Sequence, residues 1–129
     1  MSINMEIVAP ASLGILGEET ACVYLTRCLG WNVIERNVRT RYGEIDIVAC
    51  TPREVVFVEV KSRRGTRFGS ALEAVTSLKV ARLTEQARLY VHRCPFDVDD
   101  RAICLDVIGL TYGQGCLLQS IDHVRLFPE

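Results

Sequence analysis

The stretch VVFVEVKSR, from Val55 to Arg63, decides the fold because it is an apolar run interrupted by two charges. Its Val and Phe residues favour a β-strand, and the nearly continuous apolar run favours a strand that is buried on both faces. Glu59 and Lys61 lie inside this run, although Glu and Lys are rarely buried unless they are paired. The stretch therefore predicts an inner strand whose end carries either a solvated ion pair or a chemical site.

The composition is that of a globular protein. The chain has 129 residues, of which 49% are hydrophobic and 24% are charged, so one compact domain over residues 1–129 is the simplest expectation. Its 15 Lys and Arg against 16 Asp and Glu exclude a wholly basic nucleic-acid coat, but not a local basic face. No signal peptide is evident, and no apolar run reaches the ~20 residues of a membrane helix. We expect a cytoplasmic protein that does not enter the membrane.

The cysteines do not indicate a metal site or a disulfide framework. No Cys-x-x-Cys pair occurs, and His92 and His123 are the only histidines. The spacing predicts reduced, mostly buried thiols. The six residues concerned are Cys22, Cys28, Cys50, Cys94, Cys104 and Cys116.

The order of predicted elements indicates an α/β fold. A helix is predicted from Ser12 to the stop at Gly30, and a second from Ser70, where Ser70 and Glu73 form a capping box, to about His92. Three strands are predicted between the helices and two after them, which gives a mixed central sheet flanked by helices. The strands are residues 31–41, 43–50, 55–63, 101–110 and 116–126. The apolar stripe of the second helix consists of Leu72, Val75, Leu83, Ala87 and Tyr90, with Lys79 on the same stripe.

The position of a second carboxylate follows from strand geometry. Side chains alternate along a strand, so Glu59 and Lys61 point the same way, about 6.6 Å apart along the strand. The strand before them contains Asp46, and the short connection predicts an antiparallel hairpin. If the turn is centred between Pro52 and Arg53, Asp46 lies directly opposite Glu59. Like charges in that position destabilise a sheet unless a cation lies between them.

Hard oxygen ligands of this kind suit Mg²⁺ or Mn²⁺. Glu18 lies on the same face of the first helix as Ala21 and Cys22, so it points inward and could complete the cluster.

These residues carry a resemblance to a known family. GEIDIVA (43–49) and VFVEVKSR (56–63), preceded by a helix with Glu18, resemble the PD-(D/E)xK nuclease superfamily. Within it, the chain most resembles the bacterial YraN-like family of predicted endonucleases, which is similar to archaeal Holliday-junction resolvases. The match covers nearly the whole chain, although Ile45 stands where the superfamily's name has proline. The further matching segments are GEETACVYL, ERNVRTRYGEIDIVA, GSALEAVTSLK and LDVIGL.

The resemblance implies a restriction-endonuclease-like αβββαβ core and a role for each site residue. Asp46 and Glu59 would hold the metal, Glu18 would bind it directly or through water, and the Val60 carbonyl often joins such a shell. Lys61 would orient or help deprotonate the attacking water and stabilise the developing charge. The implied activity is metal-dependent cleavage of DNA, including branched DNA, with RNA ranked below DNA. Resolvase-like relatives act as dimers, so a homodimer fits the resemblance.

Basic residues flank the proposed site and are candidates for contact with the phosphate backbone. We expect binding that is salt-sensitive and largely independent of sequence. For Lys79, two interpretations remain open: it extends out of the apolar stripe to solvent, or it reaches a phosphate. The candidates are Arg39, Arg41, Arg63, Arg64, Arg67 and Lys79.

Other interpretations of these residues remain. Glu59 and Lys61 could be a solvated ion pair, and Glu18 could interact with the helix dipole. Glu44 is interpreted as structural or as supporting the site, and Asp106 as structural, paired with a basic residue. At the level of function, the alternatives to the endonuclease are a non-catalytic nucleic-acid-binding module and a structural protein whose carboxylates hold a divalent ion.

Overall fold

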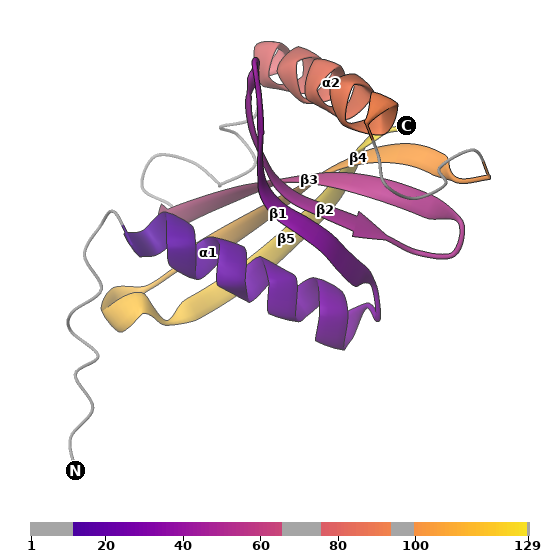
Figure 1. Cartoon of the computed structure of the whole chain (residues 1–129). Helices are drawn as coiled ribbons and strands as arrows, with labels where there is room; N and C mark the ends of the chain where they lie inside the picture. The colour runs from indigo at the N-terminus through magenta and orange to yellow at the C-terminus, as the bar shows by residue number, and fades with distance from the viewer. Residues whose placement is uncertain (1–11, 66–75, 94–99, 129) are drawn as a thin grey trace.

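A five-stranded mixed sheet lies between two helices in the computed structural model of the chain, which describes residues 12–65, 76–93 and 100–128 (Figure 1). The strands are arranged in the order β1-β2-β3-β4-β5. The helices are α1 (Ser12–Val23) and α2 (Ser77–His92), and the strands are β1 (Asn32–Thr40), β2 (Gly43–Cys50), β3 (Glu54–Arg64), β4 (Ala102–Tyr112) and β5 (Leu118–Phe127). The predicted mixed α/β architecture is confirmed.

Strand β3 is the centre of the sheet, as its apolar run predicts. Val55, Val56, Phe57 and Val58 are all fully buried. The strand pairs antiparallel with β2 and parallel with β4, and α2 lies within the connection that a parallel pair requires. Because β3 has a neighbour on both sides and a helix over each face, its apolar side chains are removed from water in both directions.

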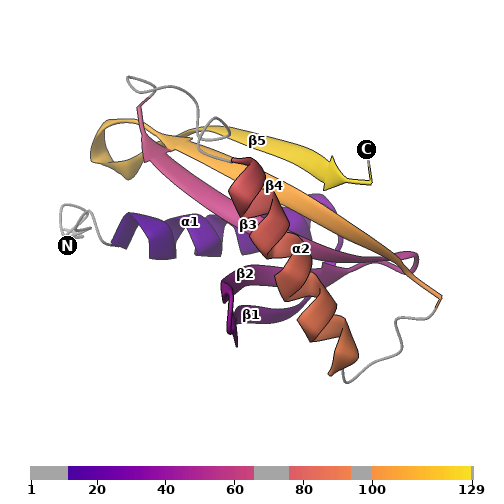
Figure 2. The ribbon, with the colours of Figure 1, turned by 90° about the horizontal axis from the view of Figure 1, so that it is seen from above.

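The two helices cover opposite faces of the sheet, as Figures 1 and 2 show together. Under α1, Ala21 and Leu25 pack against the sheet in one core cluster, and under α2, Leu83, Ala87 and Tyr90 pack in a second. The α1 helix comes unusually close to β3 at Gly17, where an added Cβ would overlap Ser62 Oγ and lie 3.2 Å from Ser62 Cβ. This glycine precedes Glu18 and sets the distance between that carboxylate and β3.

The ends of the predicted helices are partly corrected. The first helix continues as one π-helical segment, Tyr24–Cys28, and the chain turns at Gly30, whose φ of +70° fits the predicted stop. The second helix begins at Ser77 and not at Ser70, because the preceding residue, Thr76, is extended and accepts a hydrogen bond from the Lys79 amide, at 3.3 Å, as an N-cap. The proposed capping box and the first two residues of the apolar stripe lie outside the described residues.

The register of the β2–β3 hairpin is the predicted one. Ile47 pairs with Val58 and Cys50 with Val55, as required by a turn centred between residues 52 and 53. The pairing ends at Ile47, so Asp46 and Glu59 stand one step beyond the last pair. The two strands separate at that point.

Near the point where β2 and β3 separate, the side chains of β1 change the face of the sheet toward which they point. Arg36 bonds to Glu19 of α1, whereas Val38 belongs to the core under α2, although residues two apart on a regular strand share a face. The residue between them, Asn37, has a φ of +52°, and this left-handed conformation reverses the alternation. The tip of the hairpin therefore turns away from β3 and reaches α2 (Figure 1).

The thiol prediction holds in one respect and fails in another. Cys22, Cys28, Cys50, Cys104 and Cys116 are free, whereas Cys94 lies outside the described residues. Only Cys104 of these five is buried and Cys28 is exposed, so the expectation of mostly buried thiols is wrong. In the described part of the chain, no helix is both long enough and apolar enough to span a membrane.

Candidate active site

The four predicted site residues line one cavity of about 360 Å³ at the point where β2 and β3 separate. Glu18 comes from α1, Asp46 from β2, and Glu59 and Lys61 from β3. The remaining lining residues are Leu13, Gly14, Val60 and Ser62. Tertiary structure thus brings together residues that are up to 43 positions apart in the chain, from Glu18 to Lys61.

Asp46 takes the place of a backbone partner for β3. Its Oδ2 accepts a hydrogen bond of 2.8 Å from the Val60 amide, just where the β2–β3 ladder has stopped. Burial raises the pKa of the Asp46 carboxyl to about 7, with further contributions from the negative charges of Glu59 and Glu18. The Val60 hydrogen bond and the Lys61 ammonium oppose that rise. Asp46 is therefore a carboxylate that lacks sufficient positive charge around it.

Glu59 and Lys61 form an ion pair, with Lys61 Nζ 3.2 Å from Glu59 Oε1. Their side chains are 21% and 23% exposed, which is too little for the freely solvated pair of the simplest alternative. Burial acts to lower the pKa of Lys61, but the ion pair with Glu59 and the charge of Asp46 oppose it, and the pKa is raised. Lys61 is a cation at neutral pH.

Lys79 reaches the same cluster from the second helix. The neighbouring Lys61, together with burial, lowers the pKa of the Lys79 ammonium, because two positive charges are held close together. Lys79 is half-buried, so it extends neither freely into solvent nor into the core.

Asn37 belongs to the site and was not predicted. It stands across from Asp46, between the pairs Arg36–Ile47 and Val38–Ile45. With its amide nitrogen turned toward α1, Asn37 donates to both carboxylate oxygens of Glu18 at 3.1 Å. Asn is among the few non-glycine residues that tolerate a left-handed backbone, but nothing in the sequence marks this one. Asn37 therefore both bends the strand and holds Glu18.

The donor atoms match a hard divalent cation. Carboxylate oxygens from three residues and the Val60 carbonyl are ligands that Mg²⁺ and Mn²⁺ prefer, and the raised pKa of Asp46 indicates a need for positive charge at this position. Among residues 12–65, 76–93 and 100–128, no three His, Cys, Asp or Glu side chains are close enough to form a ready metal site. The carboxylates share a cavity but would have to draw together around an ion.

The predicted basic residues lie on two sides of the site. Arg39 and Arg41 are exposed near the tip of the β1–β2 hairpin, with the Arg41 guanidinium 5.6 Å from the centre of the Tyr42 ring. Arg63 and Arg64 follow Lys61 at the end of β3, half-buried and exposed respectively. Arg67 lies outside the described residues.

Two acidic residues are placed as the sequence indicated. Glu44 is exposed at the start of β2. Asp106 is 1% exposed. Its Oδ1 accepts a hydrogen bond of 2.9 Å from Arg125 Nε, and its Oδ2 forms one of 2.7 Å with His123 Nε2. Burial acts to raise the pKa of Asp106, but these two partners outweigh it and lower the pKa. Asp106 is a structural carboxylate that ties β5 to β4.

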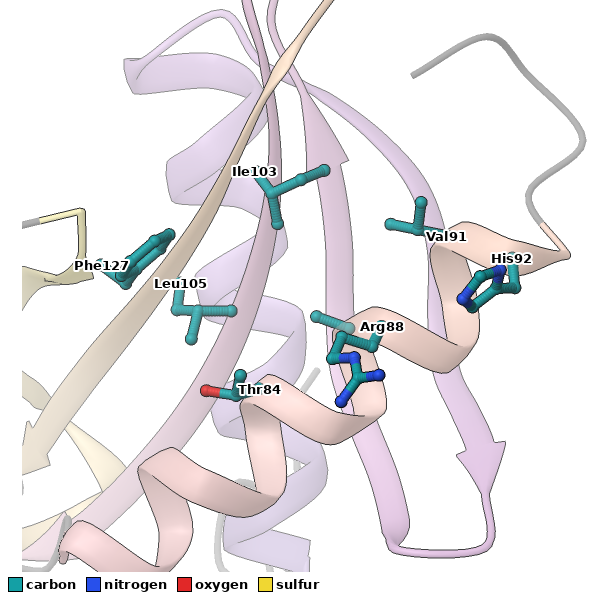
Figure 3. Close-up of a pocket in the computed structure, with 8 residues that line it drawn as sticks. Thr84, Arg88, Val91, His92, Ile103, Leu105 and Phe127 are labelled. Atoms are coloured by element: carbon teal, nitrogen blue, oxygen red, sulfur yellow. The ribbon is translucent and has the colours of Figure 1, made fainter. Parts of the chain in front are cut away.

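A cavity of about 330 Å³ between α2 and the strands β4 and β5 is of another kind (Figure 3). Its described lining residues include no carboxylate. Its lining is mainly aliphatic and aromatic, and three of the side chains, Thr84, Arg88 and His92, are polar. The remaining lining residues are Ala87, Val91, Ile103, Leu105 and Phe127. This cavity offers apolar contact and lacks the paired acidic and basic groups of the carboxylate site.

The fold and the site together define a mixed α/β protein with a carboxylate–lysine cluster where two central strands separate. Residues 17–110 match the model of the family described as "Uncharacterised protein family UPF0102", and the chain belongs to this family. It is 44% identical over 112 residues to a UPF0102 protein of Syntrophomonas wolfei, covering 87% of this chain and 93% of that protein.

Similar relatives occur in other bacteria. The chain is 42% identical over 114 residues to a UPF0102 protein of Mycobacterium tuberculosis, covering 85% of both chains. It is also 42% identical over 115 residues to one of Mycolicibacterium vanbaalenii, covering 89% of this chain and 92% of that protein. The matched segment contains all four carboxylate–lysine residues, from Glu18 to Lys61.

Proposed function

We propose that this chain is a metal-dependent endonuclease with a restriction-endonuclease-like core, which hydrolyses phosphodiester bonds in DNA, including branched DNA. The observation that carries the proposal is the meeting of Glu18, Asp46, Glu59 and Lys61 in one cavity. Phosphodiester hydrolysis needs negative charge neutralised on the phosphate and a water made nucleophilic. The resemblance to the PD-(D/E)xK nucleases supports the same chemistry.

The carboxylates would hold Mg²⁺ or Mn²⁺, with Asp46 and Glu59 as ligands, the Val60 carbonyl beside them, and Glu18 binding directly or through water. When bound, the ion supplies charge neutralisation and acidifies water. Asn37 fixes the position of Glu18 through its two hydrogen bonds. A cation would offset the burial and the neighbouring negative charges that raise the pKa of Asp46, so metal binding and deprotonation of this residue are coupled.

Lys61 would act as a cation on the phosphate. Because its pKa is raised, it keeps its proton at neutral pH, which favours donation of a hydrogen bond to a phosphoryl oxygen over removal of a proton from water. Lys79, which lies beside the same Glu59 on α2, would contact a phosphate oxygen next to Lys61. Arg39, Arg41, Arg63 and Arg64 would contact the backbone on both sides of the cut.

A second candidate is a nucleic-acid-binding module that does not cut. It is favoured by the absence of a preassembled three-ligand metal site in the described residues and by an Asp46 that is about half protonated at neutral pH without a cation. Such a module would use the basic residues alone.

One experiment separates the two candidates. Linear, flapped and four-way DNAs, with a matched RNA, are incubated with Mg²⁺ or Mn²⁺ and the wild type, Asp46→Asn, Lys61→Ala or Asp100→Asn. Asp100→Asn is the control, since Asp100 is an exposed carboxylate that does not line the carboxylate site. We expect the first two changes to reduce cleavage at least ~100-fold with DNA binding retained, and the control to cut normally. Binding by the wild type without cleavage under every metal condition would favour the module instead.

A further inference from the structure

A smaller cavity adjoins the carboxylate site and shares Glu59 with it. It has a volume of about 140 Å³ and is lined by residues from the β1–β2 hairpin, β3 and α2. Its lining residues are Tyr42, Gly43, Glu44, Glu59, Lys79, Arg82, Leu83 and Gln86. Because one wall is a proposed metal ligand, a group bound here would lie next to the phosphodiester at the carboxylate site.

Gln86 supplies hydrogen-bonding groups to this cavity. The residue is only 5% exposed and lines the cavity, and its amide is not one of the sealed, unpartnered polar groups of the described residues, so water or a ligand in the cavity can reach it. An amide that keeps little exposure and opens into a cavity has its hydrogen-bonding capacity directed at whatever occupies that cavity. Gly43, with a φ of +120°, gives the amide its room, because a Cβ there would lie 3.2 Å from Gln86 Nε2. The amide is thus free to donate to, and accept from, a ligand.

The charges around the cavity favour a neutral polar ligand over a phosphate. Lys79 and Arg82 supply two cations, but Glu44 and Glu59 supply two carboxylates, so the formal charges cancel. Carboxylates repel a phosphate, whereas they accept hydrogen bonds from the amino groups of nucleobases, and a Gln amide forms paired hydrogen bonds to a base edge.

An aromatic surface for stacking is present at the same place. The Tyr42 side chain belongs to the lining and is 43% exposed, and the Arg41 guanidinium lies 5.6 Å from its ring centre. Aromatic rings and Arg planes are the surfaces on which unpaired bases stack in nucleic-acid-binding proteins. Hydrogen-bonding groups and a stacking platform therefore meet in one small cavity.

We propose that this cavity, here named the base subsite (Tyr42, Glu44, Lys79, Arg82 and Gln86), holds one unpaired nucleobase beside the phosphodiester at the carboxylate site. The inference rests on the proposed nuclease function and specifies its substrate. A base inside a duplex would have to leave its stack to enter, which costs free energy, whereas a base at a flap or branch point is already free. The base subsite thus directs the protein to DNA with unpaired bases next to the cut.

The test is a binding experiment in EDTA, so that it does not depend on cleavage. The probes are a flapped DNA with 2-aminopurine at the first unpaired position and a fully paired duplex of the same length. Wild type is compared with Tyr42→Leu, Tyr42→Trp and Gln86→Met, and with Thr84→Met as control, an exposed position on the same helix outside the base subsite. Urea unfolding of every variant checks that it is folded.

We expect the wild type to prefer the flap and to quench 2-aminopurine fluorescence by stacking. Tyr42→Leu and Gln86→Met should each reduce the flap affinity about tenfold with little effect on the duplex, whereas Tyr42→Trp and Thr84→Met keep the preference. If Gln86→Met fails to fold, Tyr42→Leu decides, because its side chain is largely on the surface.

The outcomes separate the subsite from the nuclease. An unchanged ratio of flap to duplex affinity in Tyr42→Leu and Gln86→Met would overturn the base subsite, even if the wild type cuts DNA. A ratio that depends on these residues, in a protein that never cuts, would support the subsite and reject the nuclease. A wild type that binds neither DNA would overturn both.

Discussion

Neutralising Asp46 should stabilise the metal-free protein, and the effect should depend on pH. Asp46→Asn keeps the shape of the side chain and an oxygen to accept the Val60 hydrogen bond, but removes the charge. A rise in the Asp46 pKa from 3.8 to about 7 spans about three pH units, which at 1.36 kcal/mol each amounts to at most about 4 kcal/mol. This is the cost of holding the ionised carboxylate in the fold without a cation.

The direction in which stability changes with pH follows from proton linkage. Between about pH 4 and pH 7 the folded wild type holds a proton on Asp46 that the unfolded chain has already released. The contribution of Asp46 to stability is therefore complete below pH 4, is lost as the pH rises through about 7, and stays lost above that. The stability difference between Asp46→Asn and wild type should grow over this window by at most about 4 kcal/mol and then remain constant.

The assay is urea unfolding of both proteins from pH 4.5 to 9 in EDTA, with Glu44→Gln as the control for loss of a negative charge on the same strand. Adding Mn²⁺ at pH 8.5 should stabilise the wild type and should have much less effect on Asp46→Asn, because the ion replaces the missing positive charge. A stability difference that does not change between pH 4.5 and 9 would refute the raised pKa and, with it, the inference that Asp46 needs a cation.

Three further positions can be tested, two that hold Glu18 near β3 and one that joins β4 to β5. Asn37→Gly should fold normally, because glycine suits a φ of +52°, yet lower the Mn²⁺ affinity about tenfold in a calorimetric titration. Asn37→Asp should lower the Mn²⁺ affinity further. Wild-type affinity in Asn37→Gly would show that the Asn37 amide does not hold Glu18. Gly17→Ala should lower the free energy of unfolding in urea by about 1–3 kcal/mol, with part regained by adding Ser62→Gly, and a neutral Gly17→Ala would contradict the close approach of α1 to β3. Asp106→Asn should lower the free energy of unfolding in urea by about 3 kcal/mol at pH 7, because it leaves Arg125 and His123 without their buried anion. Since the pKa of Asp106 is lowered, this difference from wild type should vanish only in acid. A loss of stability that persists in acid would point to packing instead of charge.

Local patterns in the sequence were sufficient for most of the elements. The alternation of apolar residues placed all five strands, and the short connection at residues 51–53 fixed the β2–β3 register, because a tight hairpin leaves little freedom of alignment. The start of α2 was misplaced because Ser70 and Thr76 are both acceptable N-cap residues. Only the observed hydrogen bond from Lys79 to Thr76 distinguishes between them.

The structure added the residues whose roles depend on contacts between distant segments. Asn37 looks like an ordinary polar residue of an edge strand until its left-handed backbone turns it toward Glu18. Gln86 reads as an ordinary polar helix residue, and its place in a cavity becomes visible only once Gly43 lies against its amide.

With a turn centred between residues 52 and 53, the sequence by itself predicted that Asp46, Glu59 and Lys61 stand together, because strand alternation and hairpin register are local properties that short-range geometry enforces. It also placed Glu18 on an inward helix face. What only the tertiary structure decided is that β2 leaves β3 at Asp46, that α1 comes close enough at Gly17 to bring Glu18 into the same cavity, and that α2 brings Lys79 and Gln86 to the other side of Glu59. These features arise from the packing of two helices on opposite faces of a twisted sheet, which no single stretch of the chain contains.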